Sequence, residues 1–197
     1  MTIPPLVLGI DLGTSGVRAV VIDGRKEILQ SRATAYRRNL SDPSSWKRAC
    51  QDLIRGIPAR LRKNLKAVSV DGTSGTLLAC NHKGVPLGEA LTYSQACPEQ
   101  EQELRRLTPK GGAASSCSGS LARALRLINQ HGPDLLLRHQ ADWVTGWLLN
   151  DWRWGEEGNN LRLGWDLETS CWIDGLIEQT WSASLPAVVT SGSIFGR

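Results

Sequence analysis

The sequence predicts a protein of the α/β class, and two observations lead to that prediction. Short apolar runs separated by turn residues fill the N-terminal part, and they predict strands over residues 6–11, 17–23, 26–35, 65–71 and 75–80. One helical pattern interrupts them after residue 42, and three more follow over 98–107, 118–131 and 135–149. The order β-β-β-α-β-β is not the strict βαβ alternation of a dinucleotide-binding domain, so we expect a mixed sheet with flanking helices.

The first helix has a clear start signal. Asp42 suits the N-cap and Pro43 suits the first helical position. Apolar side chains then recur at helical spacing from Trp46 to Ile57, so one face should pack on the sheet. The helix should end near Pro58, because proline cannot continue it.

Composition is that of a globular protein. The chain has 197 residues, 41% of them apolar and 21% charged, enough for one domain with a substantial core. No stretch approaches the roughly 18 uninterrupted apolar residues of a membrane span. Residues Met1–Pro5 lack the charged-then-apolar pattern of a signal peptide, so we expect a cytoplasmic protein.

The cysteines argue against a disulfide-rich or metal-binding protein, and the charge argues against a nucleic-acid-binding protein. The five cysteines are widely spaced and no CxxC occurs, which favours reduced structural thiols over a disulfide framework or a metal site. The formal net charge of +4 comes from scattered arginines, which indicates a solvated surface and no nucleic-acid partner. His82, His131 and His139 read as structural histidines in loops or on helix surfaces.

Tryptophan is unusually frequent. Five of the eight tryptophans lie between Trp143 and Trp165, and Trp143 and Trp147 would share one face of a helix. We interpret them as a core or packing surface. The alternative is an apolar platform for a sugar ring or for a partner domain.

The segment from Leu6 to Asp23 carries the strongest functional signal. One apolar run ends in Asp11, a loop of two glycines and two hydroxyls follows, and a second apolar run begins at once. This predicts a β-hairpin whose tip offers backbone N–H groups, the hydroxyls of Thr14 and Ser15, and one carboxylate. Gly13 and Gly16 should allow a positive φ and the close approach of an anion. A carboxylate beside a phosphate needs a cation between them, so Asp11 implies Mg²⁺, held through water.

A second strand also ends in a carboxylate, and it supports a rival interpretation. Asp71 is followed by Gly-Thr-Ser-Gly75, again a turn rich in hydroxyls. If the two strands are neighbours, Asp11 and Asp71 could hold two Mg²⁺ ions, as in a ribonuclease H-type nuclease. Against this, such nucleases do not need a phosphate cradle, and the helical half supplies no clear third and fourth carboxylate.

Five segments, in chain order, resemble motifs of the FGGY carbohydrate kinases, members of the actin/hexokinase superfamily. They are Gly9–Asp23, Val68–Leu78, Ala141–Asn150, Glu157–Asp166 and Leu185–Gly192. The second resembles the ribulokinase-like and xylulokinase-like branch. The resemblance implies the N-terminal domain of such a kinase, a ribonuclease H-like mixed sheet with flanking helices, divided into a β-rich part over about 1–95 and a helical, Trp-rich part over about 96–197.

The resemblance also implies roles for particular residues. ATP phosphates and Mg²⁺ would be bound by Asp11, Gly13, Thr14 and Ser15, with Asp11 organising the ion. The sugar, a ketose, would be faced by Thr73, Ser74, Gly75, Glu157 and Asn159. Phosphoryl transfer then needs only an in-line hydroxyl, neutralised phosphates and one proton acceptor.

Three departures from the family pattern limit what the chain should do. An aromatic-x-Asp-x-Arg motif is replaced by Tyr93-Ser-Gln-Ala-Cys97, so an ion-pairing couple is neutral here. The acid of the Asp-x-Asn-Asn segment is Glu157. The family's catalytic base, an aspartate, and its C-terminal ATP-binding domain lie beyond the position of Arg197, so no catalytic residue is identified.

We therefore expect the N-terminal half of an ATP-dependent ketose kinase, acting on D-ribulose or D-xylulose and inactive alone. Its expected partners are a separately encoded C-terminal half or a second copy of the chain, since the face that normally meets the second domain would be exposed. The alternatives are a non-catalytic sugar- or nucleotide-binding module or a degenerate remnant of a kinase, and, third, the ribonuclease H-type nuclease.

Overall fold

The computed structural model describes residues 5–196. Its contacts divide the chain into two compact units, unit 1 (Met1–Thr73) and unit 2 (Ser74–Arg197), which are described separately. Residues 1–4, part of the segment that argues against a signal peptide, lie outside the described residues, as does Arg197, beyond which the base is expected. The composition changes near residue 95, whereas the contacts divide the chain earlier, because the strand after residue 76 pairs within unit 2.

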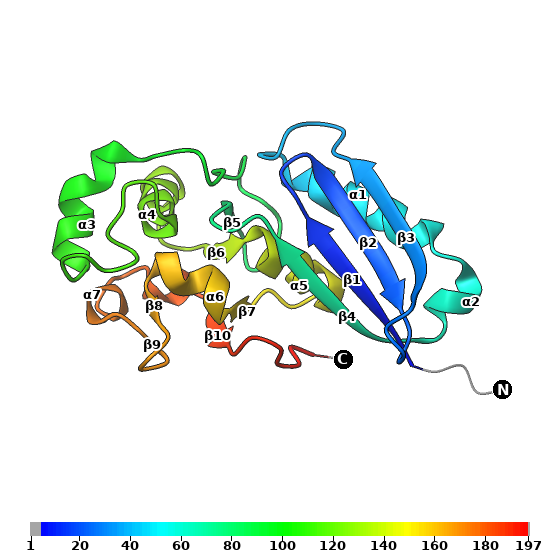
Figure 1. Cartoon of the computed structure of the whole chain (residues 1–197). Helices are drawn as coiled ribbons and strands as arrows, with labels where there is room; N and C mark the ends of the chain where they lie inside the picture. The colour runs from blue at the N-terminus through cyan, green and yellow to red at the C-terminus, as the bar shows by residue number, and fades with distance from the viewer. Residues whose placement is uncertain (1–4, 197) are drawn as a thin grey trace. The chain divides into compact units, whose positions relative to one another are not determined.

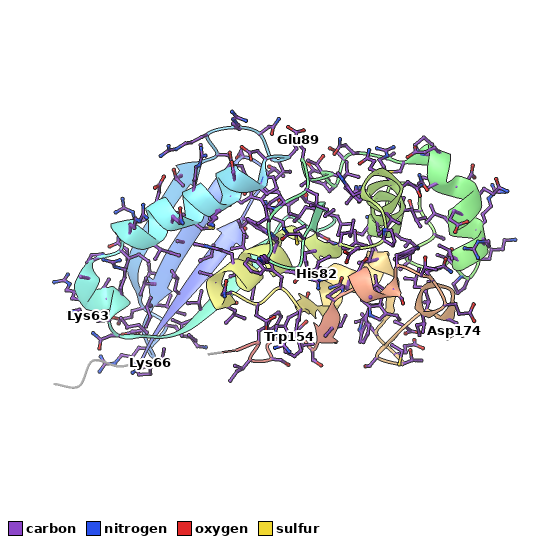
Figure 2. The ribbon with its side chains drawn as sticks, turned by 180° about the vertical axis from the view of Figure 1, so that it is seen from behind. Lys63, Lys66, His82, Glu89, Trp154 and Asp174 are labelled. Carbon is purple, nitrogen blue, oxygen red and sulfur yellow. The ribbon has the colours of Figure 1, made fainter. Side chains whose placement is uncertain are left out.

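Unit 1 is a four-stranded sheet with helices on it (Figure 1). Its elements are β1 (Leu6–Leu12), β2 (Gly16–Ile22), β3 (Ile28–Ala35), α1 (Pro43–Gly56), α2 (Ala59–Arg62) and β4 (Leu65–Gly72). The strand order is β3-β2-β1-β4; β1 pairs antiparallel with β2 and parallel with β4. Lys63 follows α2 and Lys66 lies in β4 at the end of the sheet where that strand begins (Figure 2). The expected mixed sheet is thus present.

The helix α1 begins and ends close to the positions that the sequence predicts. Asp42 is the N-cap and its carboxylate accepts from the Ser44 N–H at 2.9 Å, an interaction worth about 1 kcal/mol. The buried face of α1, including Trp46 and Leu53, packs against β2 and β3. Alternate residues of β1 and β2 are buried, as expected for a sheet covered on one face.

Unit 2 is built from short strands and helices. Its strands are β5 (Leu77–Cys80), β6 (Leu136–His139), β7 (Trp154–Glu156), β8 (Trp165–Asp166), β9 (Cys171–Trp172) and β10 (Ala187–Val189). Its α-helices are α3 (Glu101–Leu107), α4 (Ser120–His131), α5 (Gln140–Leu149), α6 (Glu157–Asn160) and α7 (Asp174–Ile177). Single 3₁₀ turns occur at Pro98–Gln100, Leu161–Leu163 and Ser182–Ser184. Its core lies around α4, whose buried leucines meet β5, β6 and α3.

One predicted helix is wrong at its N-terminal end. Residues 135–149 read as one helix, but β6 occupies Leu136–His139 and only the remainder is helical. The four residues of β6 pair antiparallel with β5, and all eight are buried. A short apolar run does not distinguish a buried strand from a buried helix, and the partner strand decides here. His139 is therefore buried in β6 rather than on a helix surface.

Trp143 of α5 and Trp152, which follows α5, belong to the packing of unit 2. Trp143 is buried, and its indole N–H donates to the Gly84 carbonyl at 3.0 Å. The Trp152 indole N–H donates to the Trp143 carbonyl at 3.1 Å and its ring lies against Gly84 and Gly146, where a Cβ would overlap it. This supports the interpretation as a packing surface for these residues.

Two negative observations concern the described residues. No helix among them is both long enough and apolar enough to cross a membrane. Within the same part of the chain no cysteine forms a disulfide; Cys50, Cys80 and Cys97 are buried and Cys171 is exposed.

Candidate functional site

The candidate site in unit 1 is the loop that joins β1 to β2. β1 ends at Leu12 and β2 begins at Gly16, so the loop is Gly13–Ser15, and the Gly13 N–H donates to the Gly16 carbonyl at 2.9 Å. The structure therefore brings Asp11, Gly13, Thr14 and Ser15 together, in the hairpin that the sequence predicts.

Tyr36 fixes this loop by donating hydrogen bonds to two of its three carbonyl groups. Its hydroxyl donates to the Gly13 carbonyl at 2.9 Å, and its backbone N–H donates to the Ser15 carbonyl at 3.0 Å. The N–H and hydroxyl groups of Thr14 and Ser15 donate to no residue between 5 and 196, and both residues are exposed. The donors of Thr14 and Ser15 thus stay available while the carbonyls of Gly13 and Ser15 are occupied, which is an arrangement that suits an anion.

An open pocket of about 440 Å³ adjoins the loop. It is lined by the loop, by Val17 and Arg18 of β2, and by residues 33–35 of β3. Arg18 lies opposite Asp11 in the β1–β2 register, and its Nη1 is 3.2 Å from the Asp11 Oδ2. Sequence reasoning did not assign Arg18; the signal was available, because residues paired across a hairpin share a face.

The glycines of the hairpin do not have the backbone conformation that the sequence predicts. Neither Gly13 nor Gly16 has a positive φ, so the expectation of that conformation is wrong. A Cβ on Gly16 would lie 2.3 Å from the Thr34 carbonyl oxygen of β3, so Gly16 is needed for close approach of two backbones. A Cβ on Gly13 would make an ordinary contact at 3.4 Å.

The carboxylates beside the hairpin suit Mg²⁺. Asp11 and Asp71 are direct register partners on the parallel strands β1 and β4, so neighbouring strand ends meet as predicted. Both are exposed. Among residues 5–196, no group of three or more His, Cys, Asp and Glu could hold a metal ion. One or two carboxylates completed by water and phosphate is the arrangement that Mg²⁺ accepts, so the residues fit the ion.

The predicted sugar-side turn begins in unit 1 and continues into unit 2. In unit 1 the Thr73 hydroxyl donates to the Leu12 carbonyl at 3.0 Å. In unit 2 Ser74 is exposed, whereas Gly75 is buried with φ +80°, a conformation that glycine adopts without strain.

Arg123, in the first turn of α4, binds the backbone of the turn at Gly75. It is 1% exposed, and its guanidinium donates only to backbone carbonyls. The acceptors are Gly75 at 3.1 Å, Gln95 at 3.1 Å, Ser118 at 2.8 Å, and Tyr93. Burial lowers the pKa of Arg123, and repulsion from Arg162 and Arg126 lowers it further, with the Cys97 thiol acting in the opposite direction. Sequence reasoning missed this residue, since nothing local marks a buried arginine.

Glu157 and Asn159 lie in α6 and make internal bonds. The Glu157 Oε1 accepts from the Ser191 N–H at 2.9 Å, and the Asn159 amide donates to the Asp142 Oδ1 at 3.2 Å. The cap of α6 is Glu156, which accepts from the N–H groups of Gly158 and Asn159. A sugar contact by Glu157 or Asn159 stays a prediction.

Buried polar side chains adjoin Glu157 and Asn159 and contact one another in series. The His139 Nε2 is 2.9 Å from the Ser120 hydroxyl, and its Nδ1 is 3.8 Å from the Asp142 Oδ2. Asp142 also accepts from the Glu156 N–H at 3.1 Å and from the Asn160 amide at 3.3 Å. Ser120 lies beside Gly75, so this series of buried polar contacts extends within unit 2 from the Gly75 turn to α6.

The structure is similar to sugar kinases of known structure. Glycerol kinase from Plasmodium falciparum, solved with ADP, matches 98% of the chain with a TM-score of 0.80 and 16% identity. Xylulose kinase from Bifidobacterium adolescentis matches 94% with a TM-score of 0.71 and 16% identity. Gluconate kinase from Lactobacillus acidophilus matches 94% with a TM-score of 0.63 and 15% identity. No family model matches the sequence.

The chain has a sugar-kinase fold. This confirms the predicted fold class, a mixed sheet with flanking helices, which these sugar kinases of the actin/hexokinase fold share. The chain spans 44% of the glycerol kinase and 47% of the xylulose kinase, so it covers less than half of these sugar kinases. Their different substrates show that one fold serves several sugars and polyols, and the fold does not select among them.

Proposed function

We propose that this chain supplies the phosphate- and sugar-binding half of an ATP-dependent ketose kinase, with D-ribulose or D-xylulose as substrate. The observation that carries the proposal is the Gly13–Ser15 loop, in which the donors of Thr14 and Ser15 bond to no residue between 5 and 196, set in a sugar-kinase fold. A terminal phosphate would accept from the N–H and hydroxyl groups of Thr14 and Ser15. Arg18 adds a positive charge at the same pocket.

Mg²⁺ would be held through water by Asp11, with Asp71 beside it. Bound there, the ion would neutralise phosphate charge during transfer. Asp11 then orients the ion, and Arg18 keeps the Asp11 carboxylate in place. Thr73, Ser74, Gly75, Glu157 and Asn159 are proposed to face the ketose, with Tyr93 added because its ring is exposed and its Cβ would neighbour a side chain at Gly75.

We also propose that this chain of 197 residues needs a second half of the enzyme to phosphorylate its substrate. In the sugar kinases that it matches, more than half of the enzyme lies outside the matched part. The partner would be that remaining part as a separate chain, or a second copy of this chain. A cytoplasmic location is proposed because free cysteines are typical of reducing compartments.

The first test is a titration of the chain with ATP·Mg²⁺, in which binding is monitored by the NMR signals of the backbone amides. We expect shifts at Thr14 and Ser15, and a loss of Mg²⁺-dependent affinity of at least tenfold in D11N. The control is D52N, which changes an exposed aspartate paired with Arg37 on the same unit. Equal weakening in both variants, or no shift at the loop, would contradict the phosphate site.

The second test is ADP release with ATP, Mg²⁺ and D-ribulose or D-xylulose. The chain alone should give none, and addition of the missing part of a ketose kinase should give sugar-dependent release. Release by the chain alone would support the kinase and overturn the need for a second half. Binding of sugar and ATP with no release in either case would favour the non-catalytic binding module.

The nuclease is the second candidate, and the Asp11–Asp71 register pair favours it. Two carboxylates on neighbouring strands are part of a two-metal site, which normally has further acidic ligands. Among residues 5–196 no third ligand joins them. Mg²⁺-dependent cleavage of plasmid DNA or duplex RNA that D71N abolishes would overturn the kinase proposal.

A further inference from the structure

Arg123 connects three loops that are distant in sequence. The Gly75 carbonyl belongs to the turn after β4, the Tyr93 and Gln95 carbonyls belong to the loop before α3, and the Ser118 carbonyl belongs to the loop before α4. We call these the three sugar-side loops. Each loop has an exposed residue at or beside the carbonyl that Arg123 binds: Ser74, Tyr93 and Ser118.

The chemistry of this contact requires arginine. Four carbonyls in different directions are reached by one planar guanidinium with five N–H groups in a fixed fork. A lysine ammonium has three donors on one atom and cannot reach all three loops. Because every acceptor is backbone, the contact fixes main-chain positions whatever side chains the loops carry.

The charge of Arg123 is uncompensated. Among residues 5–196 no carboxylate forms an ion pair with it, although Arg126, three residues along the same helix, pairs with Glu99 at 2.7 Å. Burying an unpaired charge is costly, and here only carbonyl dipoles offset the cost. An apolar residue would pack at lower cost, so the loops themselves must need the guanidinium.

We propose that Arg123 is a positioning residue that holds the three sugar-side loops in the geometry that binds a neutral polyhydroxy substrate. The inference rests on the proposed function, because it takes the Gly75 turn to face the sugar. Arg123 does not touch the substrate. It fixes the spacing of the Ser74 hydroxyl, the Tyr93 ring and the Ser118 hydroxyl before the sugar arrives, which lowers the ordering cost of binding.

The test compares R123K with R126K. Both keep the charge, lie three residues apart on α4, and remove a guanidinium that bonds loop carbonyls, but Arg126 is a surface ion-pair residue. D-ribulose and D-xylulose affinity is measured by titration calorimetry well below the melting temperature of each variant. We expect R123K to bind at least tenfold more weakly, and R126K to stay within twofold of the wild type.

A second readout does not depend on sugar. In R123K, amide hydrogen exchange should speed up at the three sugar-side loops and stay unchanged in β5 and β6. Faster exchange with unchanged affinity would reduce Arg123 to a structural residue and overturn the proposal. If the wild-type chain binds neither ketose, the sugar assignment fails, and exchange then decides whether Arg123 positions the loops at all.

A third readout covers the case in which R123K does not fold. In the wild-type chain the Nε–H signals of Arg123 and Arg126 are followed during titration with the ketose that binds. The backbone amide signals of Ser74, Tyr93 and Ser118 should shift, whereas the Nε–H signals of Arg123 and Arg126 should stay in place, because Arg123 holds the loops before the sugar binds. Unmoved amide signals of these three residues at saturation, or a large shift of the Arg123 signal, would overturn the proposal.

Discussion

The Gly13–Ser15 loop and the three sugar-side loops are organised in opposite ways. The first consists of three consecutive residues in a hairpin between two adjoining strands, and one distant residue, Tyr36, braces it. The second is assembled from three segments, around Gly75, Tyr93 and Ser118, that are 18 to 43 residues apart from one another, and a single buried side chain joins them. A local loop can be inferred from the order of residues along the chain. A non-local one depends on packing that the order does not display.

The same contrast holds for the charges. In unit 1 the arginine at the site, Arg18, is exposed and pairs with Asp11. In unit 2, Arg123 and Arg138 are buried and donate to backbone carbonyls. Exposed pairs contribute little to stability, whereas removal of a buried charge network costs several kcal/mol. Unit 2 should therefore be the more sensitive to single substitutions.

The largest effect is expected at Arg138. Its guanidinium donates to the Leu137 carbonyl at 2.6 Å, to the Ser184 carbonyl at 3.0 Å and to Trp152, and burial lowers its pKa to about 10. R138M should destabilise unit 2 by about 3 kcal/mol, because several buried carbonyls lose their donor. Urea unfolding followed by tryptophan fluorescence measures this, since seven of the eight tryptophans lie in unit 2.

R153M is the matched control for R138M. Arg153 is an exposed arginine that pairs with Asp151 at 2.7 Å, and its loss should cost less than about 1 kcal/mol. Equal losses in the two variants would mean that burial is not what distinguishes the arginines of unit 2.

The next effect tests the local hairpin. G16A would place a Cβ 2.3 Å from the Thr34 carbonyl oxygen and 2.8 Å from the Ala35 Cα, so the β2–β3 contact must separate. We expect the free energy of unfolding of unit 1 to fall by about 2 kcal/mol. Thermal unfolding monitored by the circular dichroism of the sheet measures this. G13A, with its contact at 3.4 Å, should cost less than half as much. A larger loss in G13A would show that the loop conformation, and not the approach of β3, requires the glycine.

The sequence predicts unit 1 well because its signals are local. The Asp42 cap, the alternation of β1 and β2 and the composition of the hairpin loop each act within a few residues, and the structure has them at those positions. The fold class also agrees with prediction, and the condition that the strands ending near Asp11 and Asp71 are neighbours is met.

Unit 2 is predicted less well because its structure depends on distant partners. Leu136–His139 becomes a strand only because β5 lies beside it. Arg123 and Asp142 acquire their roles from carbonyls and amides elsewhere in the chain. Their residue types alone would place them on the surface. Physical pattern reading therefore finds the conformation of the Gly13–Ser15 hairpin loop and misses Arg123 and Asp142, whose contacts are distant in sequence.

The smallest effect concerns Glu156, which joins α6 to Ser191. Burial raises the pKa of Glu156, but hydrogen bonds from Ser191, Gly158 and Asn159 outweigh it and hold the pKa below its ordinary value. A lowered folded-state pKa gives stability that is fully present above the unfolded pKa, about 4.3, and is lost as the pH falls through the folded value. E156Q should therefore cost about 1 kcal/mol at pH 7 and nothing at a pH below the folded pKa. Urea midpoints of the wild type and of E156Q between pH 3 and pH 7 measure this.

E168Q is the control. Glu168 is exposed, and among residues 5–196 its backbone N–H is bonded to Asp166 whereas its carboxylate is not bonded, so the substitution should cost close to nothing at every pH. A cost of E156Q that does not change with pH would show that shape at the start of α6, and not the charge of Glu156, stabilises the junction with Ser191.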